Sequence, residues 1–133
     1  MIKYATAEDI AYLKDNDHHI TTDLITKKVN NKEYLIAFSN KNAIGFLRFN
    51  YFWDNTPFIN MLVVNEDNRK TGVGKNLMDF FEAKMKAKGF NMVMTSTLAD
   101  ETAQHFYRKL GYVDRGCLML DNEALEILFV KKI

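Results

Sequence analysis

Residues 69–75 read Arg69-Lys70-Thr71-Gly72-Val73-Gly74-Lys75, and they stand where a polar segment turns into a long helical pattern. The apolar run before them, residues 58–64, is typical of a strand. After them, apolar residues recur at helical spacing up to Gly89, where the helix is expected to end. The next strand is predicted at residues 92–97. Strand, loop, helix and strand in this order predict a right-handed crossover between parallel strands, and hence an α/β (α+β) fold with a mixed sheet.

Polar turns, rather than a linker or a repeat, divide the rest of the chain, so we expect one domain over residues 1–133. The turns at 39–42 and 54–57 are too short for crossovers, and the strands around them are expected to form an antiparallel meander. By apolar content, the remaining strands are predicted at 2–5, 34–38, 43–52, 113–120 and 125–131. The remaining helices are predicted at 7–15, 21–29 and 102–110.

The composition excludes several classes of protein. Hydrophobic residues make up 47% and charged residues 26%, which is ordinary for a globular domain and excludes disorder. A net charge of +1 gives no electrostatic support for binding nucleic acid or an anionic membrane surface. No apolar run is long enough to span a bilayer, and Glu8 and Asp9 interrupt any apolar leader. With Cys117 as its one cysteine, the protein is expected to be cytoplasmic.

Residues 69–75 have the composition of an anion-binding loop. Backbone N–H groups at a helix start have no partner within the helix and carry partial positive charge. Gly72 and Gly74 allow a ligand to approach the backbone closely. Positive side chains are added by Arg69, Lys70 and Lys75. The alternative is a solvated, basic helix start, and by position alone the two interpretations are nearly equal.

Two other phosphate-binding motifs are excluded at this loop. A Walker A loop requires Gly and Ser or Thr at the positions that Arg69 and Asn76 occupy. The dinucleotide fingerprint requires Gly or Ala at Leu77, after the first strand of a doubly wound sheet. The sequence therefore argues against an ATPase and an NAD-dependent enzyme.

Two motifs resemble those of the GNAT superfamily of acyl-CoA N-acyltransferases. Arg69-x-x-Gly72-x-Gly74 resembles the (Gln/Arg)-x-x-Gly-x-(Gly/Ala) signature, and residues 103–112 resemble the helix Ala-x-x-Phe-Tyr-x-Lys-Leu-Gly-Phe. The order of elements is similar over essentially the whole chain. The resemblance implies a single GNAT-like acetyltransferase domain, in which the meander is followed by a splayed pair of parallel strands with a crossover helix.

The resemblance also implies a site for acetyl-CoA, the acyl donor of the family. The loop would hold the pyrophosphate, and the pantetheine arm would pair with residues 62–64 in a V-shaped gap beside strand 92–97. A backbone N–H near Leu62 would polarise the thioester carbonyl. The coenzyme-binding residues implied in this way are Leu62, Val63, Val64, Arg69, Lys70, Thr71, Gly72, Val73, Gly74, Lys75 and Asp100.

The sequence departs from the family pattern at two positions, of which only Asp100 belongs to this set. Asp100 stands where many members carry Asn, and a carboxylate cannot donate a hydrogen bond to pantetheine. Capping the following helix is the alternative role for Asp100. Glu66 stands where Pro is frequent, so the turn before the loop is expected to be less rigid.

Tyr107 matches the family tyrosine that protonates the departing thiolate. A phenol of pKa about 10 can donate to a thiolate whose acid has a pKa near 8.5 if the site perturbs either pKa modestly. The alternative is that Tyr107 only packs on an apolar helix face, the role that we assign to Phe106, Leu110 and Tyr112.

The implied acceptor is a primary amine of a small molecule or a peptide, and it must lose a proton before it attacks. The strand at 58–64 supplies no carboxylate as a base, and Asn60 is available only to position a water. Trp53 and Asp54 are candidates for holding a cationic amine, with strand-end packing as the alternative. The three histidines, His18, His19 and His105, form no metal motif, so no metal site is expected.

The first functional hypothesis is an acetyl-CoA-dependent N-acetyltransferase working by direct attack of the amine. Cys117 lies away from both motifs, so no nucleophile is placed for a covalent acetyl-enzyme route. A non-catalytic module that binds or senses acyl-CoA is the alternative, and transfer of a longer acyl group is a third hypothesis. The oligomeric state is left open, with a homodimer through the strand at 125–131 as one alternative because many relatives pair through late strands.

Overall fold

The computed structural model describes the whole chain, residues 1–133. The strands are β1 (Ile2–Tyr4), β2 (Tyr34–Ser39), β3 (Asn42–Phe52), β4 (Thr56–Val64), β5 (Met92–Leu98), β6 (Val113–Leu118) and β7 (Glu126–Lys132). The α-helices are α1 (Ile10–Asn16), α2 (Thr22–Asn30), α3 (Val73–Ala87) and α4 (Ala103–Lys109), and two short 3-10 helices are η1 (Ala7–Asp9) and η2 (Glu66–Asn68). Each predicted strand and helix is present, with its ends moved by a few residues.

Seven strands are hydrogen-bonded in the order β1-β2-β3-β4-β5-β7-β6. The β4–β5 pair is parallel, with Phe58 opposite Met94 and Ile59 opposite Thr95. The pairs β1–β2, β2–β3, β5–β7 and β6–β7 are antiparallel. A mixed sheet with one parallel pair, joined by the crossover helix α3, confirms the predicted fold class.

The chain divides into two compact units. The first consists of Met1–Phe49 and Met61–Phe81, and the second of Asn50–Asn60 and Glu82–Ile133. The chain passes between them within β3, β4 and α3, so each unit is built from segments distant in sequence.

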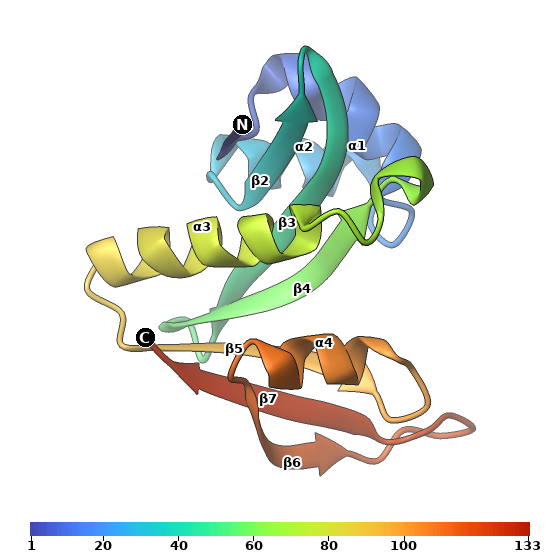
Figure 1. Ribbon diagram of the computed structural model, residues 1–133, viewed down its shortest axis with the longest axis vertical. Coiled ribbons are helices and arrows are strands. Elements are labelled where there is room, and N and C mark those ends of the chain that lie inside the picture. The colour runs from blue at the N-terminus through green and yellow to red at the C-terminus, as the bar shows by residue number, and fades with distance from the viewer. The chain divides into compact units, whose positions relative to one another are not determined.

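In the first unit, α1 and α2 cover β2 and β3. Figure 1 shows the two helices lying together beside these strands. Ile25 and Val29, four residues apart, lie on one face of α2 and are buried. They join a core formed by Ala5, Leu13, Tyr34, Ile36 and Phe46. The apolar stripe of each helix is thus what attaches it to the sheet.

A buried ion pair ties the end of α1 to β2 and β3. Arg48 Nε donates to Asp17 Oδ2 at 2.7 Å, and the Tyr34 hydroxyl donates to the same oxygen at 2.7 Å. The Asp17 side chain is 0% exposed, so these bonds compensate its charge. Burial, together with the charge of Asp17, raises the pKa of Tyr34, and the hydroxyl therefore remains a donor.

Gly45 allows β4 and the first residue of α3 to approach β3. A Cβ at this position would lie 2.7 Å from the backbone oxygen of Val63, 3.3 Å from Val64 Cα and 3.5 Å from Val73 Cγ1. The first of these distances is shorter than real side chains adopt, and the atom it meets is backbone. Glycine is therefore required here by space.

Replacing Gly45 with Ala is expected to lower the free energy of unfolding by about 2 kcal/mol, a usual cost of overpacking. The added methyl group must push the end of β4 away from β3. The atom that it meets, the Val63 oxygen, is part of the backbone and cannot rotate out of the way as a flexible side chain could. Urea titration of the wild type and the variant measures the difference. An unchanged unfolding midpoint would contradict the close approach.

In the second unit, α4 packs on β5 and β7. Figure 1 shows α4 lying beside these two strands. The ring centroid of Tyr107 is 6.0 Å from that of Phe129 on β7 and 5.8 Å from that of Tyr112. These contacts fix the face of α4 that carries Tyr107.

Candidate functional site

The predicted site residues divide between the two units. Residues 62–64 and 69–75 belong to the first unit. The others, Trp53, Asp54, Asn60, Asp100 and Tyr107, belong to the second.

The loop at residues 69–75 ends in free backbone N–H groups at the start of α3. The helix begins at Val73, and the amide of Asn76 donates to Gly72 O at 2.9 Å. The amides of Val73, Gly74 and Lys75 precede this bond and have no partner within the helix. Together with the helix dipole, they suit an anion.

Two residues of the loop have left-handed backbone conformations, Lys70 with φ 60° and Gly72 with φ 90°. A Cβ on Gly72 would meet no atom within 4 Å, so it is the conformation rather than the space that favours glycine there. The Thr71 hydroxyl donates to the backbone oxygen of Asn68 and holds the turn between them. The left-handed Lys70 carries no signal in the sequence, because this conformation is common only for Gly, Asn and Asp.

The positively charged side chains of the loop differ in their partners. Arg69 Nε donates to the backbone oxygen of Val64 at 3.2 Å, which holds the arginine against the end of β4. Lys75 Nζ pairs with Asp79 Oδ2 at 2.6 Å on the exposed face of α3. Because Asp79 partly neutralises Lys75, the remaining positive charge of the loop rests on Arg69 and Lys70.

Tyr107 is buried in α4 at the place where β4 and β5 pair. Only 7% of its surface is exposed, and its hydroxyl forms a hydrogen bond with Thr95. Thr95 Oγ1 in turn donates to the backbone oxygen of Ile59 at 3.0 Å. Thr95 and Ile59 are partners in the parallel register, so the phenol lies beside the parallel pair. The family motif includes Tyr107 but not Thr95, whose role depends on this register.

Burial raises the pKa of Tyr107. The hydrogen bond with Thr95 acts in the opposite direction, and the charge of Glu101 raises the pKa further. The pKa of Tyr107 therefore lies above the ordinary tyrosine value of about 10. At neutral pH the phenol is protonated, and it can act as a proton donor.

Asp100 lies exposed in the turn between β5 and α4. Its alternative role as a helix cap is not observed, because the N-cap residue of α4 is Thr102. The turn is closed instead by Gln104, whose Nε2 donates to the backbone oxygens of Ala99 and Glu101, each at 2.8 Å. Gln104 fills a variable position of the helix motif, so no sequence pattern distinguishes it.

The three acceptor-side candidates lie on the β3–β4 hairpin. Trp53 and Asp54 form its turn with φ of 55° and 61°, an uncommon conformation for a bulky residue such as Trp. Trp53 is 75% exposed, with its ring centroid 4.5 Å from that of Phe52. Asn60 Nδ2 donates to Asn50 Oδ1 at 2.6 Å, so Asn60 is held by the neighbouring strand.

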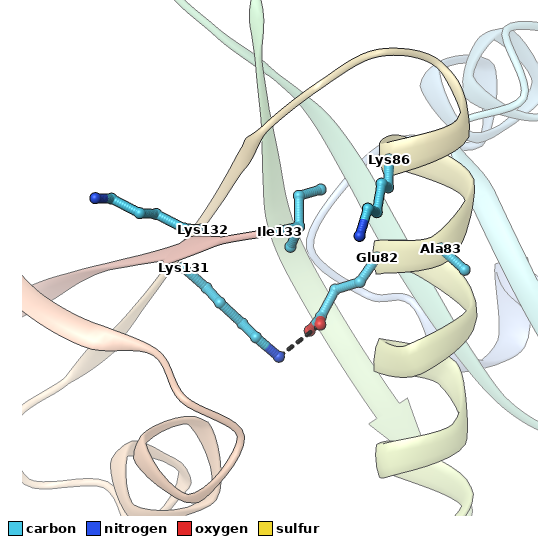
Figure 2. Close-up of a pocket in the computed structure, with 6 residues that line it drawn as sticks. All are labelled: Glu82, Ala83, Lys86, Lys131, Lys132 and Ile133. Atoms are coloured by element: carbon cyan, nitrogen blue, oxygen red, sulfur yellow. Dashed lines mark hydrogen bonds and ion pairs between the residues drawn. The ribbon is translucent and has the colours of Figure 1, made fainter.

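A cavity of about 190 Å³ lies in the second unit and is lined by Glu82, Ala83, Lys86, Lys131, Lys132 and Ile133. Figure 2 shows Lys131 pointing toward Glu82, with which it pairs at 2.6 Å, and Lys132 pointing away. Tyr112 donates to the other carboxylate oxygen of Glu82 at 3.0 Å. None of the predicted site residues lines this cavity.

The histidines and the cysteine, which are common metal ligands, do not gather at one site. The three histidines are exposed, as is Cys117 on β6. No group of three or more His, Cys, Asp or Glu side chains that could hold a metal ion is found. No helix combines the length and the apolar character needed to cross a membrane.

Comparison with known proteins gives one family match. Residues 4–112 match the model of the acetyltransferase (GNAT) family. No curated protein matches the chain. The family match agrees with the resemblance of the two motifs, one of which precedes strand β5 in the sequence and the other of which follows it.

Solved structures share the fold over the whole length of the chain. Ard1 from Thermoplasma volcanium is 20% identical with a TM-score of 0.85, covering 100% of this chain and 97% of that chain. A chain of the NatC complex bound to Gag peptide and coenzyme A is 18% identical with a TM-score of 0.82, covering 100% and 98%. An aminoglycoside 6′-N-acetyltransferase complexed with coenzyme A is 18% identical with a TM-score of 0.79, covering 99% and 96%. At these identities, the likeness shows the fold.

Proposed function

Because the chain belongs to the acetyltransferase (GNAT) family, we propose that it is an N-acetyltransferase that moves an acetyl group from acetyl-CoA to a primary amine. In this proposal, residues 1–133 act as one such domain. The observation that carries it is the loop before α3, where free N–H groups and the left-handed Gly72 occur with the charges of Arg69 and Lys70. Backbone amides and fixed cations are the donors that suit a pyrophosphate.

The coenzyme-binding residues are those of the loop and of the end of β4. Residues 69–75 bind the pyrophosphate, mainly through the backbone, and residues 62–64 bind the pantetheine arm. The bond from Arg69 Nε to the backbone oxygen of Val64 supports this arrangement, because it attaches the loop to the strand that would bind the arm. The amide near Leu62 polarises the thioester carbonyl. Asp100 is the remaining contact of the proposal.

Tyr107 is the general acid of the proposed reaction. As the amine nitrogen bonds to the thioester carbon and the carbon–sulfur bond breaks, Tyr107 donates its hydroxyl proton to the departing sulfur. The amine gives up one proton to water, and Tyr107 regains its proton from solvent. No side chain of β4 is a carboxylate, so water positioned by Asn60 takes the place of a protein base.

That missing carboxylate also favours a second candidate, a non-catalytic module that binds or senses acyl-CoA. Asn60 is an amide and cannot accept a proton at neutral pH. The loop and the buried phenol serve such a module equally well as a coenzyme site. The two candidates differ only in whether an amine causes release of the thiol.

The acceptor in this proposal is a primary amine of a small molecule or a peptide. The exposed ring of Trp53 and the carboxylate of Asp54 suit a cationic amine, by contact with the ring face and by charge. We further propose a cytoplasmic location, to which the exposed thiol of Cys117 is suited, and a homodimer through β7.

The test combines calorimetric titration of the full chain by acetyl-CoA with a free-thiol assay over a panel of primary amines. Saturable binding and amine-dependent thiol release are expected. Binding without release for any amine would favour the sensing module. Absence of binding would overturn both candidates. Longer acyl-CoA donors in the same assay show whether the protein transfers an acyl group longer than acetyl.

A further inference from the structure

Asn65 stands between β4 and η2, just before the coenzyme loop, and its polar groups are engaged on every side. Its Oδ1 accepts a hydrogen bond from the Tyr12 hydroxyl at 2.7 Å, and its Nδ2 donates to Ala43 O at 3.2 Å. Its backbone N–H donates to Ile44 O at 2.8 Å, and its carbonyl accepts from the amide of Asn68 at 2.9 Å. One residue is thus attached to α1, β3 and η2 at once.

The neighbouring contacts attach one end of the loop to the end of β4 and place the other end beside the start of β3. Gly45 is the residue after Ile44, and it lies against Val63, Val64 and the first residue of α3. Arg69 Nε returns to the backbone oxygen of Val64 at 3.2 Å. The start of β3 and the Tyr12–Asn65 pair therefore form a seat for residues 69–75, and all of these residues belong to the first unit.

The chemistry of the pair is directional. An amide can accept from Tyr12 and donate to Ala43 O at the same time, whereas a carboxylate would place a second acceptor against that carbonyl. Burial raises the pKa of Tyr12, so its hydroxyl stays a donor over the neutral range. The Tyr12 ring is fixed by edge contact with Phe46 at 6.5 Å between centroids. The donor, the amide and the acceptor are thus held in place.

We infer that Tyr12 and Asn65 are positioning residues that hold residues 69–75 in the conformation that receives the coenzyme pyrophosphate. The inference rests on the proposed function, because it assigns these residues an effect on the same loop. A loop already held in its bound conformation has less conformational freedom to lose on binding. Helix α1 therefore contributes to coenzyme affinity without touching the coenzyme, through a bond that joins residues 53 positions apart.

The test compares Tyr12→Phe and Asn65→Asp with Tyr34→Phe as a matched control. Tyr34 also donates a 2.7 Å hydrogen bond within the first unit, but to Asp17 rather than to a residue of the seat. Calorimetry gives the Kd for coenzyme A. Turnover of acetyl-pantetheine, a donor without pyrophosphate, gives kcat/KM for a substrate that the loop does not bind.

Tyr12→Phe is expected to weaken coenzyme A binding about fivefold, the effect of one lost hydrogen bond, and Asn65→Asp by about tenfold or more. The kcat at saturating acetyl-CoA and the kcat/KM for acetyl-pantetheine should stay at the wild-type values. Tyr34→Phe should lower the unfolding midpoint and leave the coenzyme A Kd unchanged.

Wild-type coenzyme affinity in both seat variants would overturn the inference and leave the proposed function standing. An equal loss with coenzyme A and with acetyl-pantetheine would also overturn it, because general damage affects both donors. If the wild type itself does not bind coenzyme A, the proposed function fails and the inference fails with it. If Asn65→Asp does not fold, the milder Tyr12→Phe decides the result.

Discussion

Replacing Gly72 with Asp is expected to lower the affinity for acetyl-CoA by about 100-fold or more. Gly72 has φ 90° and immediately precedes the free amides at the start of α3. A carboxylate there would lie beside the two phosphates of the proposed ligand. At a separation of about 5 Å, two like charges near a protein surface repel by about 3 kcal/mol, which exceeds the 2.7 kcal/mol of a 100-fold change.

Gly72→Asn is the matched control for this variant, because it has the same size and shape without the charge. Asn also tolerates a left-handed backbone, and a side chain at position 72 meets open space. We expect the Asn variant to bind within about tenfold of the wild type, since one phosphate contact is altered at most. Equal losses for Asn and Asp would show that backbone strain, not charge, is responsible. If the Gly72→Asp variant binds acetyl-CoA with wild-type affinity, the loop is not part of the coenzyme site.

Local sequence patterns predicted the elements but not their ends. The predicted helix at 7–15 is divided into η1 and α1, because the first turn tightens to 3-10 geometry where Asp9 Oδ2 accepts from the amide of Thr6 at 2.8 Å. The turn predicted at 54–57 is shorter, and Pro57 is buried inside β4. Trp53 and Asp54 supply the left-handed positions, which Asn and Gly usually fill, so the pattern did not mark Trp53 as part of this turn.

The loop could be located from its glycines, whereas the residues that hold it could not. Glycine spacing and basic charge are local properties, and residues 69–75 carry both within seven positions. Tyr12 and Asn65 are joined across 53 positions, and Thr95 and Ile59 across 36. Such partners depend on strand register and helix packing, which a local pattern does not contain. The family motif found Tyr107, but only the fold shows the Thr95 hydroxyl beside it.

Replacing Tyr107 with Phe is expected to lower kcat by about 100-fold, while the affinity for acetyl-CoA changes by no more than about threefold. General acid catalysis typically accelerates a reaction by a factor of about 10² to 10⁴. The lower end of this range applies here because a thiol of pKa near 8.5 leaves readily as a thiolate. Phe retains the ring contacts with Phe129 and Tyr112. Steady-state turnover on a working amine and calorimetry with acetyl-CoA measure the two quantities separately.

Tyr112→Phe provides the matched control in the same unit. Tyr112 is 2% exposed, compared with 7% for Tyr107, and its hydroxyl bonds to Glu82 at 3.0 Å. Both variants therefore lose one hydrogen bond of a buried phenol, but only Tyr107 lies beside the parallel β4–β5 pair. We expect wild-type kcat for Tyr112→Phe. Equal losses in the two variants would indicate a loss of stability rather than of an acid.

The pH dependence of kcat gives an independent check on the acid. A general acid must be protonated, and burial raises the pKa of Tyr107 above the ordinary value of about 10. Its protonated fraction, and with it kcat, is therefore full across neutral pH and falls only as pH rises past that raised pKa. The wild type should show no loss of kcat from this group between about pH 7 and 9. A decline within that range that disappears in Tyr107→Phe would mean that the phenolate forms at a pKa that is not raised. Full turnover by the Phe variant at every pH would mean instead that the thiolate leaves unprotonated and that Tyr107 only packs against Phe129.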